Sequence, residues 1–255
     1  MLEKVKFIAK EAGNVIRDGF GKNFSIEFKT NESNIVTEID KQSEKIIKEF
    51  INIEFPTHGI LAEESGSTSG SSEYLWVIDP IDGTTNFAHG LPIFSVSIGV
   101  QKNGVTICGV VYDVMRDCLY SADLGNGCYL NNQKVNVNKN NNLKRSLLVT
   151  GFPYEISENP DLAIERFSDF LKNSRGVRRL GSAAIDLCYV ASGIFEGYWE
   201  VNLQPWDMCA GIFLVEEAGG KATNFKNGKI NIYSRQILAT NGHVHESMLE
   251  ILNKY

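Results

Sequence analysis

The chain has 255 residues, of which 43% are hydrophobic and 22% are charged. These proportions are ordinary for a globular protein, and the length suits one large domain or two closely packed ones. The net charge is -6, and lysine and arginine form no long block. Composition therefore argues against a nucleic-acid-binding protein.

The cysteines and the first residues bear on the cellular compartment. There are five cysteines, an odd number, and none forms a Cys-x-x-Cys pair. This usage is typical of a reduced protein whose cysteines are small core residues. The first residues mix both charges and lack the apolar core of a signal peptide, and no uncharged apolar run reaches ~18 residues. We expect a cytoplasmic protein without a membrane partner.

The first half of the chain begins with two predicted helices. Helical spacing of apolar residues predicts them over 2–20 and about 38–54. Thr37 can cap the second helix, and Asp40, three residues later, completes the pattern of a capping box. The polar, poorly periodic segment 21–34 predicts a loop or a short hairpin.

The following segment is mainly β in pattern. Residues 65–72, rich in glycine and serine, predict a loop. Residues 131–142, rich in asparagine, predict a hairpin and a connector. Apolar runs between turn residues predict strands over 60–62, 75–78, 93–100, 105–112, 118–122 and 128–130.

Strands and helices alternate in the second half. The predicted strands are 146–151, 177–180, 194–201, 221–225 and 236–240. The predicted helices lie near 160–172, 182–192, 205–218 and 244–254. We therefore expect an α+β domain over 1–143 and an α/β domain over 144–255.

The segment from Trp76 to Phe87 is the most informative part of the sequence. It reads Trp-Val-Ile-Asp-Pro-Ile-Asp-Gly-Thr-Thr-Asn-Phe. Pro80 is expected to end the strand, because proline offers no N–H to a sheet. Asp79 and Asp82 then follow the strand end, as carboxylate ligands of a hard metal ion do. The backbone N–H groups of Gly-Thr-Thr can hold an anion, and a metal beside an anion indicates phosphoryl chemistry.

Each acidic residue of interest also has a structural interpretation. Asp-Pro and Asp-Gly are common turn dipeptides, and Glu63 and Glu64 can form a solvated turn. Asp40 can serve the capping box, Thr84 can cap a helix, and Asp207 can complement a helix dipole. The functional case depends on the set as a whole.

Loops can bring the whole set together at one cleft. Crowded carboxylates repel one another, and a divalent cation relieves the repulsion. Oxygen ligands favour magnesium, calcium or manganese over zinc. His243 and His245 have no setting typical of a metal site, and we expect them at the surface.

At these residues the chain resembles the inositol monophosphatase family of magnesium-dependent, lithium-sensitive sugar phosphatases. One family signature matches Trp76–Phe87, and a second matches Trp206–Gly211 with its continuation to Gly220. Shorter blocks match at Val36–Asp40 and Ala62–Ser65, so the resemblance spans nearly the whole chain. It implies a layered αβαβα sandwich, with most metal ligands in the first half, and a homodimer.

The resemblance also implies the metal ligands. Glu63, Asp79 and the backbone carbonyl of Ile81 would hold a first magnesium ion. Asp79, Asp82 and Asp207 would hold a second, and Glu63 would contribute through water to a weaker third. Manganese is a possible substitute for magnesium.

The remaining catalytic roles come from the same resemblance. Asp40 and Thr84 would orient and deprotonate the attacking water, with Glu63 assisting. The backbone N–H groups of Gly83 and Thr84, with Thr85 beside them, would hold the phosphate.

The resemblance leaves the substrate open. Glu200, at the end of a Tyr-Trp-Glu block, would contact substrate hydroxyls, and Ser182 and Ala183 would line the same pocket. A strand-end acid is an equally good interpretation of Glu200. Arg178 and Arg179 could reach a second phosphate or pair with acids.

The expected activity is hydrolysis of the phosphate monoester of a small polyol or sugar. Inositol 1-phosphate is the default substrate. Two alternatives are fructose 1,6-bisphosphate and the 2′-phosphate of the nucleotide cofactor NADP. The loop 21–34, which contains Lys29, would influence which substrate is preferred. A function of another class, as a binding partner of the transcription machinery, also stays open, although the acidic balance argues against direct RNA binding.

Overall fold

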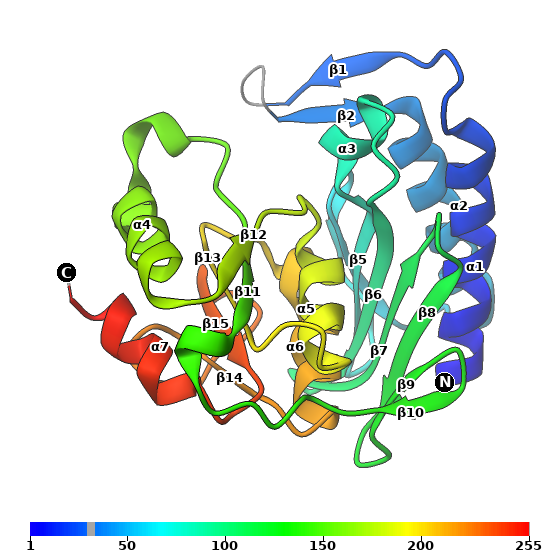
Figure 1. Cartoon of the computed structure of the whole chain (residues 1–255). Helices are drawn as coiled ribbons and strands as arrows, with labels where there is room; N and C mark the ends of the chain where they lie inside the picture. The colour runs from blue at the N-terminus through cyan, green and yellow to red at the C-terminus, as the bar shows by residue number, and fades with distance from the viewer. Residues whose placement is uncertain (30–33, 255) are drawn as a thin grey trace.

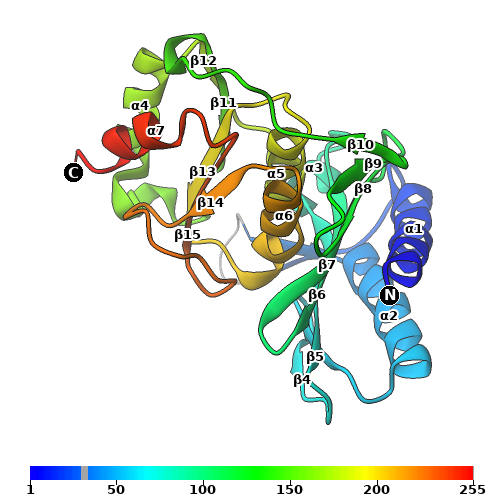
Figure 2. The ribbon, with the colours of Figure 1, turned by 90° about the horizontal axis from the view of Figure 1, so that it is seen from below.

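The computed structural model describes residues 1–29 and 34–254. Helices and sheets alternate in five layers, which run in Figure 1 from α1 and α2 on the right to α4 and α7 on the left. Two sheets form the second and fourth layers, and α5 and α6 lie between them. Figure 2 shows the same order from below. The predicted αβαβα sandwich is confirmed.

The first layer packs on an apolar face of the larger sheet. α1 (Leu2–Gly19) and α2 (Glu38–Glu54) bury one stripe each, which includes Val5, Ile8 and Ile16 on α1. The predicted cap of α2 is confirmed. The N–H groups of Ile39 and Asp40 donate to the Thr37 hydroxyl, and the Thr37 N–H donates to the Asp40 carboxylate. Both helices follow their predicted ranges because periodicity and caps agree.

The larger sheet has eight strands in the order β10-β9-β8-β7-β6-β5-β3-β4. Neighbours are antiparallel except for β3 and β5, which are parallel. The strands are β3 (Gly59–Ala62), β4 (Gly66–Thr68), β5 (Tyr74–Asp82), β6 (Ser95–Lys102), β7 (Val105–Asp113), β8 (Cys118–Asp123), β9 (Cys128–Leu130) and β10 (Gln133–Val135).

Two predictions about this sheet are wrong. Residues 65–72 were expected to be a loop, but β4 pairs with β3 inside that range. The second error is that Pro80 does not end β5, which continues to Asp82. The pairing of β5 with β6 is irregular between Asp79 and Asp82, and an irregularity of this kind accommodates a residue without an N–H.

The middle helices are buried on almost every side. α5 (Ala183–Ala191) and α6 (Pro205–Glu217) lie between the sheets, and α6 buries every residue from Met208 to Val215. A Cβ at Gly211 would overlap Leu187 of α5, and one at Gly99 on β6 would overlap Cys209. Glycine at these two positions therefore lets α6 approach both neighbours closely.

The smaller sheet has the order β12-β11-β13-β15-β14. Its strands are β11 (Leu147–Thr150), β12 (Gly176–Arg178), β13 (Gly197–Val201), β14 (Lys221–Thr223) and β15 (Gln236–Thr240). The 3₁₀ turns η1 (Leu143–Arg145), η2 (Ile156–Glu158) and η3 (Pro160–Leu162) lie in the connections. α4 (Ala163–Asn173) and α7 (His245–Leu252) cover the outer face through a third apolar cluster.

His245 is buried, so the expectation that it lies at the surface is wrong, whereas His243 is exposed. Nε2 of His245 lies 3.0 Å from the Thr223 hydroxyl, and Nδ1 lies 2.9 Å from the Thr240 hydroxyl. Both ring nitrogens are therefore satisfied by the sheet that α7 covers.

Two short elements remain near one end of the larger sheet. β1 (Ile26–Phe28) and β2 (Ile35–Thr37) pair antiparallel. The predicted hairpin is therefore present, but its second strand lies beyond the predicted range 21–34, and residues 30–33 lie outside the described residues. α3 (Thr84–Ala88) follows β5 directly. The cysteines are unpaired, and all but Cys118 are buried. Within the described ranges, no helix has the length and apolar character to span a membrane.

Candidate active site

Three aspartates from two distant parts of the chain meet beside the end of β5. Asp79 and Asp82 come from β5, and Asp207 comes from the first turn of α6; one carboxylate oxygen of each lies within 4.8 Å of the others. Asp79 is 2% exposed, and its Oδ1 has no hydrogen-bond partner among the described residues. A buried, unpartnered carboxylate is unfavourable, so this cluster suits a cation.

Burial is the main influence on these carboxyl groups. It raises the pKa of Asp79 well above the ordinary value, and the charges of Glu63, Asp82 and Asp207 raise it further. Burial likewise raises the pKa of Asp207 well above the usual range. It raises the pKa of Asp82 to about 6, although hydrogen bonds from α5 oppose this shift. The charged cluster is stable only with compensation.

Asp82 and Asp207 are each positioned by a helix start. The Ser182 hydroxyl donates to Asp82, and the N–H groups of Ala183 and Ala184 do so at 3.2 and 2.8 Å. Asp207 Oδ2 accepts the N–H of Gln204 at 2.7 Å. Three donors at the positive end of α5 therefore hold Asp82 in place.

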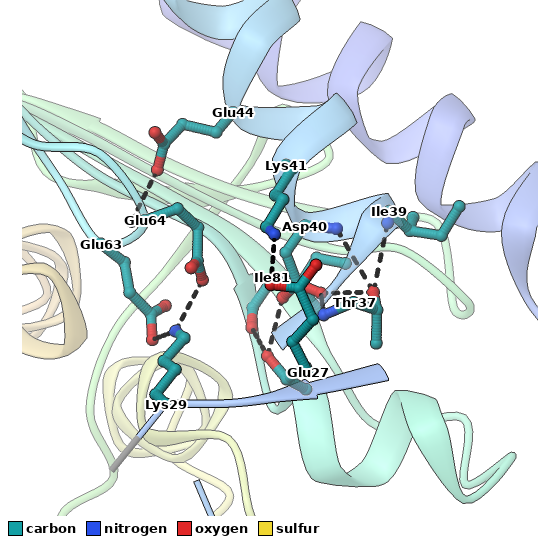
Figure 3. A network of polar contacts seen from close by, with 11 residues as sticks. Glu27, Lys29, Thr37, Ile39, Asp40, Lys41, Glu44, Glu63, Glu64 and Ile81 are labelled. Atoms are coloured by element: carbon teal, nitrogen blue, oxygen red, sulfur yellow. Dashed lines mark hydrogen bonds and ion pairs between the residues drawn. The ribbon is translucent and has the colours of Figure 1, made fainter. Parts of the chain in front are cut away.

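Glu63 and Glu64 follow β3 and meet a cation from the β1–β2 hairpin. Nζ of Lys29 lies 2.7 Å from each carboxylate, as Figure 3 shows. Burial alone would lower the pKa of Lys29, but the charges of Glu63 and Glu64 raise it. Glu63 is thus already paired with an ammonium group, which a metal ion at Glu63 would have to displace or share.

Asp40 and Thr84 form a second buried pair. The Thr84 hydroxyl lies 2.8 Å from Asp40 Oδ1 and 2.9 Å from the carbonyl oxygen of Ile81. Burial raises the pKa of Asp40 to about 6, and the bonds from Thr37 and Thr84 oppose that shift. Asp40 therefore serves both the cap of α2 and Thr84. Instead of capping a helix with its side chain, Thr84 joins Asp40 to the end of β5.

Gly83 shapes the turn between these groups. Its φ of 101° is left-handed, and a Cβ there would lie 3.0 Å from the carbonyl oxygen of Ile93. Only glycine fits this turn without strain. The N–H groups of the first turn of α3, which follows β5 directly, have no partner within the helix.

A pocket of about 430 Å³ opens over these groups. Asp40, Asp79 and Ile81 are buried and are not among its lining residues. The predicted site residues that line it are Glu63, Asp82, Gly83, Thr84, Thr85, Ser182, Ala183, Glu200 and Asp207. Arg179 also lines it, whereas Arg178 does not. Residues from both halves of the chain therefore meet at one cavity.

Glu200 lies on β13 in the wall of this pocket. The Tyr198 hydroxyl donates to Oε2 at 2.6 Å, and burial raises the pKa of Glu200 to about 7. A Cβ at Gly151 would overlap the Glu200 carboxylate. Sequence reasoning missed Gly151 and Asp186, which also line the pocket. A lone acid in the otherwise apolar helix 183–191 was the available signal for Asp186.

A model of the inositol monophosphatase family matches residues 2–255. The chain belongs to the inositol monophosphatase family. It is 41% identical to "Nus factor SuhB" of Pasteurella multocida, over 96% of this chain and 92% of the relative. It is 39% identical to "Fructose-1,6-bisphosphatase/inositol-1-monophosphatase" of Aquifex aeolicus, over 100% of this chain and 96% of the relative.

A solved structure agrees with this assignment. The inositol monophosphatase of Anabaena (Nostoc) superposes with a TM-score of 0.89 at 43% identity, covering 98% of this chain and 94% of that one. The family makes this protein a phosphatase that acts on phosphorylated substrates, and its members generally use magnesium. The three clustered aspartates, with the unpartnered Oδ1 of Asp79, fit such an ion.

Proposed function

We propose that the protein hydrolyses the phosphate monoester of a small polyol or sugar, with inositol 1-phosphate as the first candidate. One observation carries this proposal: the cluster of three aspartates, of which Asp79 and Asp82 are buried, lies beside the Asp40–Thr84 pair under one pocket. Carboxylates for metal ions, a hydroxyl–carboxylate pair and N–H groups for an anion are the parts that phosphoester hydrolysis needs.

The metal ions would be held by the residues at the end of β5 and their neighbours. Asp79, Asp82 and Asp207 would share one magnesium ion, and Glu63, Asp79 and the Ile81 carbonyl another. Glu63 could also serve a weaker third. Such ions, when bound, stabilise charge on phosphoryl oxygens and lower the pKa of a water molecule. Manganese accepts the same oxygen ligands.

The chain's own groups would position water and phosphate. The Thr84 hydroxyl, 2.8 Å from Asp40 Oδ1, would accept the proton of the attacking water while its own proton passes to Asp40. The N–H groups of Gly83 and Thr84, with Thr85 beside them, would bind the phosphate oxygens. Glu63, which also lines the pocket, would help to orient the water.

Other phosphate esters are alternative substrates. The relative from Aquifex aeolicus carries a name with two activities, which favours fructose 1,6-bisphosphate as an alternative, and the 2′-phosphate of NADP stays a third. Arg179 at the pocket could contact a second phosphate. Ser182 and Ala183, besides holding Asp82, could contact the ester.

A panel of esters tests the proposal. Phosphate release is measured with magnesium and with EDTA from inositol 1-phosphate, fructose 1,6-bisphosphate, NADP and 2′-AMP. We expect magnesium-dependent release, fastest from inositol 1-phosphate. Equal release in EDTA, or no release from any ester by folded protein, contradicts the proposal.

A role as a binding partner of the transcription machinery is the second candidate function. The name of the Pasteurella multocida relative favours it. Such a role should survive Asp79→Asn, whereas phosphatase activity should not. Capture of transcription proteins by both the wild type and this variant would support the docking role. Lithium inhibition and a homodimer are further expectations, tested by phosphate release with lithium and by light scattering.

A further inference from the structure

Helix α2 presents three buried polar side chains to the segments that carry the candidate metal ligands. Asp40, Ser43 and Glu44 are buried, and their spacing of three and four residues places them on one face of the helix. A helix that packs on a sheet normally buries apolar residues on that face. The proposed reaction uses Asp40, but it does not use Ser43 or Glu44.

Ser43 is hydrogen-bonded to β5 and not to its own helix. A serine inside a helix commonly donates to the carbonyl oxygen four residues earlier, but the Ser43 hydroxyl donates to the carbonyl oxygen of Pro80 at 3.1 Å. Pro80 lies in the irregular stretch between Asp79 and Asp82, where the pairing of β5 with β6 shifts. Ser43 therefore fixes the peptide group between Pro80 and Ile81, directly after Asp79.

Glu44 holds the turn that follows β3. Its Oε2 accepts the N–H of Glu64 at 2.8 Å, as Figure 3 shows. The preceding N–H, that of Glu63, donates to the carbonyl oxygen of Ile78 on β5 at 3.2 Å. Two successive N–H groups are thus bound, one by α2 and one by β5. These bonds fix the backbone of Glu63 beside the end of β5.

The two proposed metal ions depend on different helices. The proposed ligands of the first ion are Glu63, Asp79 and the Ile81 carbonyl. Ser43 and Glu44 hold the backbone next to these ligands. Asp82 and Asp207, which belong to the second ion alone, are held by the starts of α5 and α6. A change on α2 should therefore reach the first ion and spare the second.

We propose that Ser43 and Glu44 are positioning residues, which set the geometry of the first metal site by binding the backbone at Pro80 and Glu64. Neither side chain is needed to cap α2, because Thr37 does so. Groups that hold metal ligands in place change the metal affinity about 10- to 100-fold when they are removed. The inference rests on the proposed function, from which it takes the ligands of the first ion.

Manganese binding tests the inference without any substrate. The free ion is counted by electron paramagnetic resonance, which gives the Kd of each bound ion. Ser43→Ala removes one hydroxyl, and Glu44→Leu removes the acceptor while keeping the bulk. Each should raise the Kd of the first ion about tenfold or more and leave that of the second almost unchanged. Gln42→Ala and Glu49→Leu, at exposed positions of α2, are the matched controls and should change neither Kd.

Two background variants identify which ion is affected. Asp207→Asn removes a ligand of the second ion only, and Glu63→Gln removes a ligand of the first only. Ser43→Ala should weaken binding of the manganese ion that remains in Asp207→Asn and should not weaken that in Glu63→Gln. Equal weakening in both backgrounds would overturn the inference, because a general loosening of the fold would then explain the effect.

A conservative variant separates positioning from charge and from folding. Glu44→Gln keeps an oxygen that can accept the Glu64 N–H, so it should restore most of the affinity that Glu44→Leu loses. If Glu44→Gln binds as weakly as Glu44→Leu, the charge and not the hydrogen bond is responsible, and the inference is overturned for Glu44. If Glu44→Leu does not fold, Ser43→Ala decides, and an unchanged Kd of the first ion in that variant overturns the inference.

Phosphate release keeps this inference distinct from the proposed function. In Ser43→Ala, the magnesium concentration for half-maximal release should rise by about the same factor as the Kd of the first ion. A wild type that binds two manganese ions but releases no phosphate contradicts only the proposed function, and the comparison of Kd values still decides the role of Ser43 and Glu44. A wild type that binds no manganese overturns both.

Discussion

Two groups of acidic residues line or border the pocket, and they differ in their hydrogen-bond partners. At the end of β5, Asp82 accepts several hydrogen bonds, but Oδ1 of the neighbouring Asp79 accepts none from the residues that the structure describes. In the wall formed by β13, the Tyr198 hydroxyl donates to Glu200 at 2.6 Å, and Oδ1 of Asp186 has no hydrogen-bond partner among the described residues. Three carboxylates with oxygens within 4.8 Å of one another suit a divalent cation, whereas Asp186 and Glu200 lie outside that group. Closely spaced charge therefore distinguishes the candidate metal site from the other acids of the pocket.

Removing one carboxylate from the cluster should have the largest effect. Asp79→Asn should lower turnover by roughly 10³-fold or more, because metal ions supply several kcal/mol of charge stabilisation. The variant should fold, since it loses a repulsive buried charge. Thermal melts provide the check: magnesium should raise the Tm of the wild type and leave that of the variant almost unchanged. An equal rise in both would place the metal elsewhere.

Breaking the Asp40–Thr84 pair should affect turnover and leave metal binding intact. Thr84→Val removes the hydroxyl that lies 2.8 Å from Asp40, and kcat should fall by about 10²-fold or more, as for loss of a general base. Thr84→Ser should restore most of the rate, since it keeps the hydroxyl. A normal kcat in the valine variant would exclude the proposed proton path.

In the wild type, we expect Lys29 to weaken the binding of metal ions near Glu63. Its ammonium lies 2.7 Å from Glu63, so Lys29→Gln should lower the magnesium concentration for half-maximal activity about three- to tenfold, which corresponds to ~1 kcal/mol. Lys41→Gln is the matched control, because Lys41 pairs with the exposed Glu27 at 2.7 Å. A higher magnesium requirement in Lys29→Gln would show that Lys29 supports metal binding.

His245 provides a comparison outside the pocket, because threonine hydroxyls satisfy both its ring nitrogens. Burial lowers the pKa of His245 to about 4. The folded state therefore favours the neutral ring. The contribution of this ring to the free energy of unfolding is complete above the unfolded pKa of about 6.5, and it is lost as the pH falls from there towards 4. Urea melts at pH 7 and at pH 4 give the drop in the free energy of unfolding between the two conditions. This drop should be ~1–3 kcal/mol smaller for His245→Gln than for the wild type. Parallel losses would contradict this account.

The sequence predicted most elements, and it failed where tertiary contacts override a local signal. Helix 38–54 was predictable because apolar spacing and the Thr37 cap agree. The extension of β5 past Pro80 depends on an irregular pairing with β6, which no local pattern reveals. β4, which reads Gly-Ser-Thr, forms despite its loop-like composition because it pairs with β3. His245 is buried because α7 closes over two threonines of the smaller sheet.

The candidate site, like the fold, could be predicted only in part from the sequence. The signature residues Asp79, Asp82 and Asp207 were recognisable together, and the structure brings them within 4.8 Å. Their roles in catalysis stay predictions, as does the domain boundary near residue 143. The ion pair of Lys29 and the unpaired oxygen of Asp186 could not be predicted, because both depend on which distant segments meet at the pocket.

The most direct test of the central claim is phosphate release from inositol 1-phosphate by the wild type and by Asp79→Asn, measured across a magnesium titration. We predict release by the wild type that rises with magnesium and disappears in EDTA, and almost none by the variant at any concentration. Comparable release by the two proteins would contradict the claim that the three clustered aspartates form the metal site of a phosphatase.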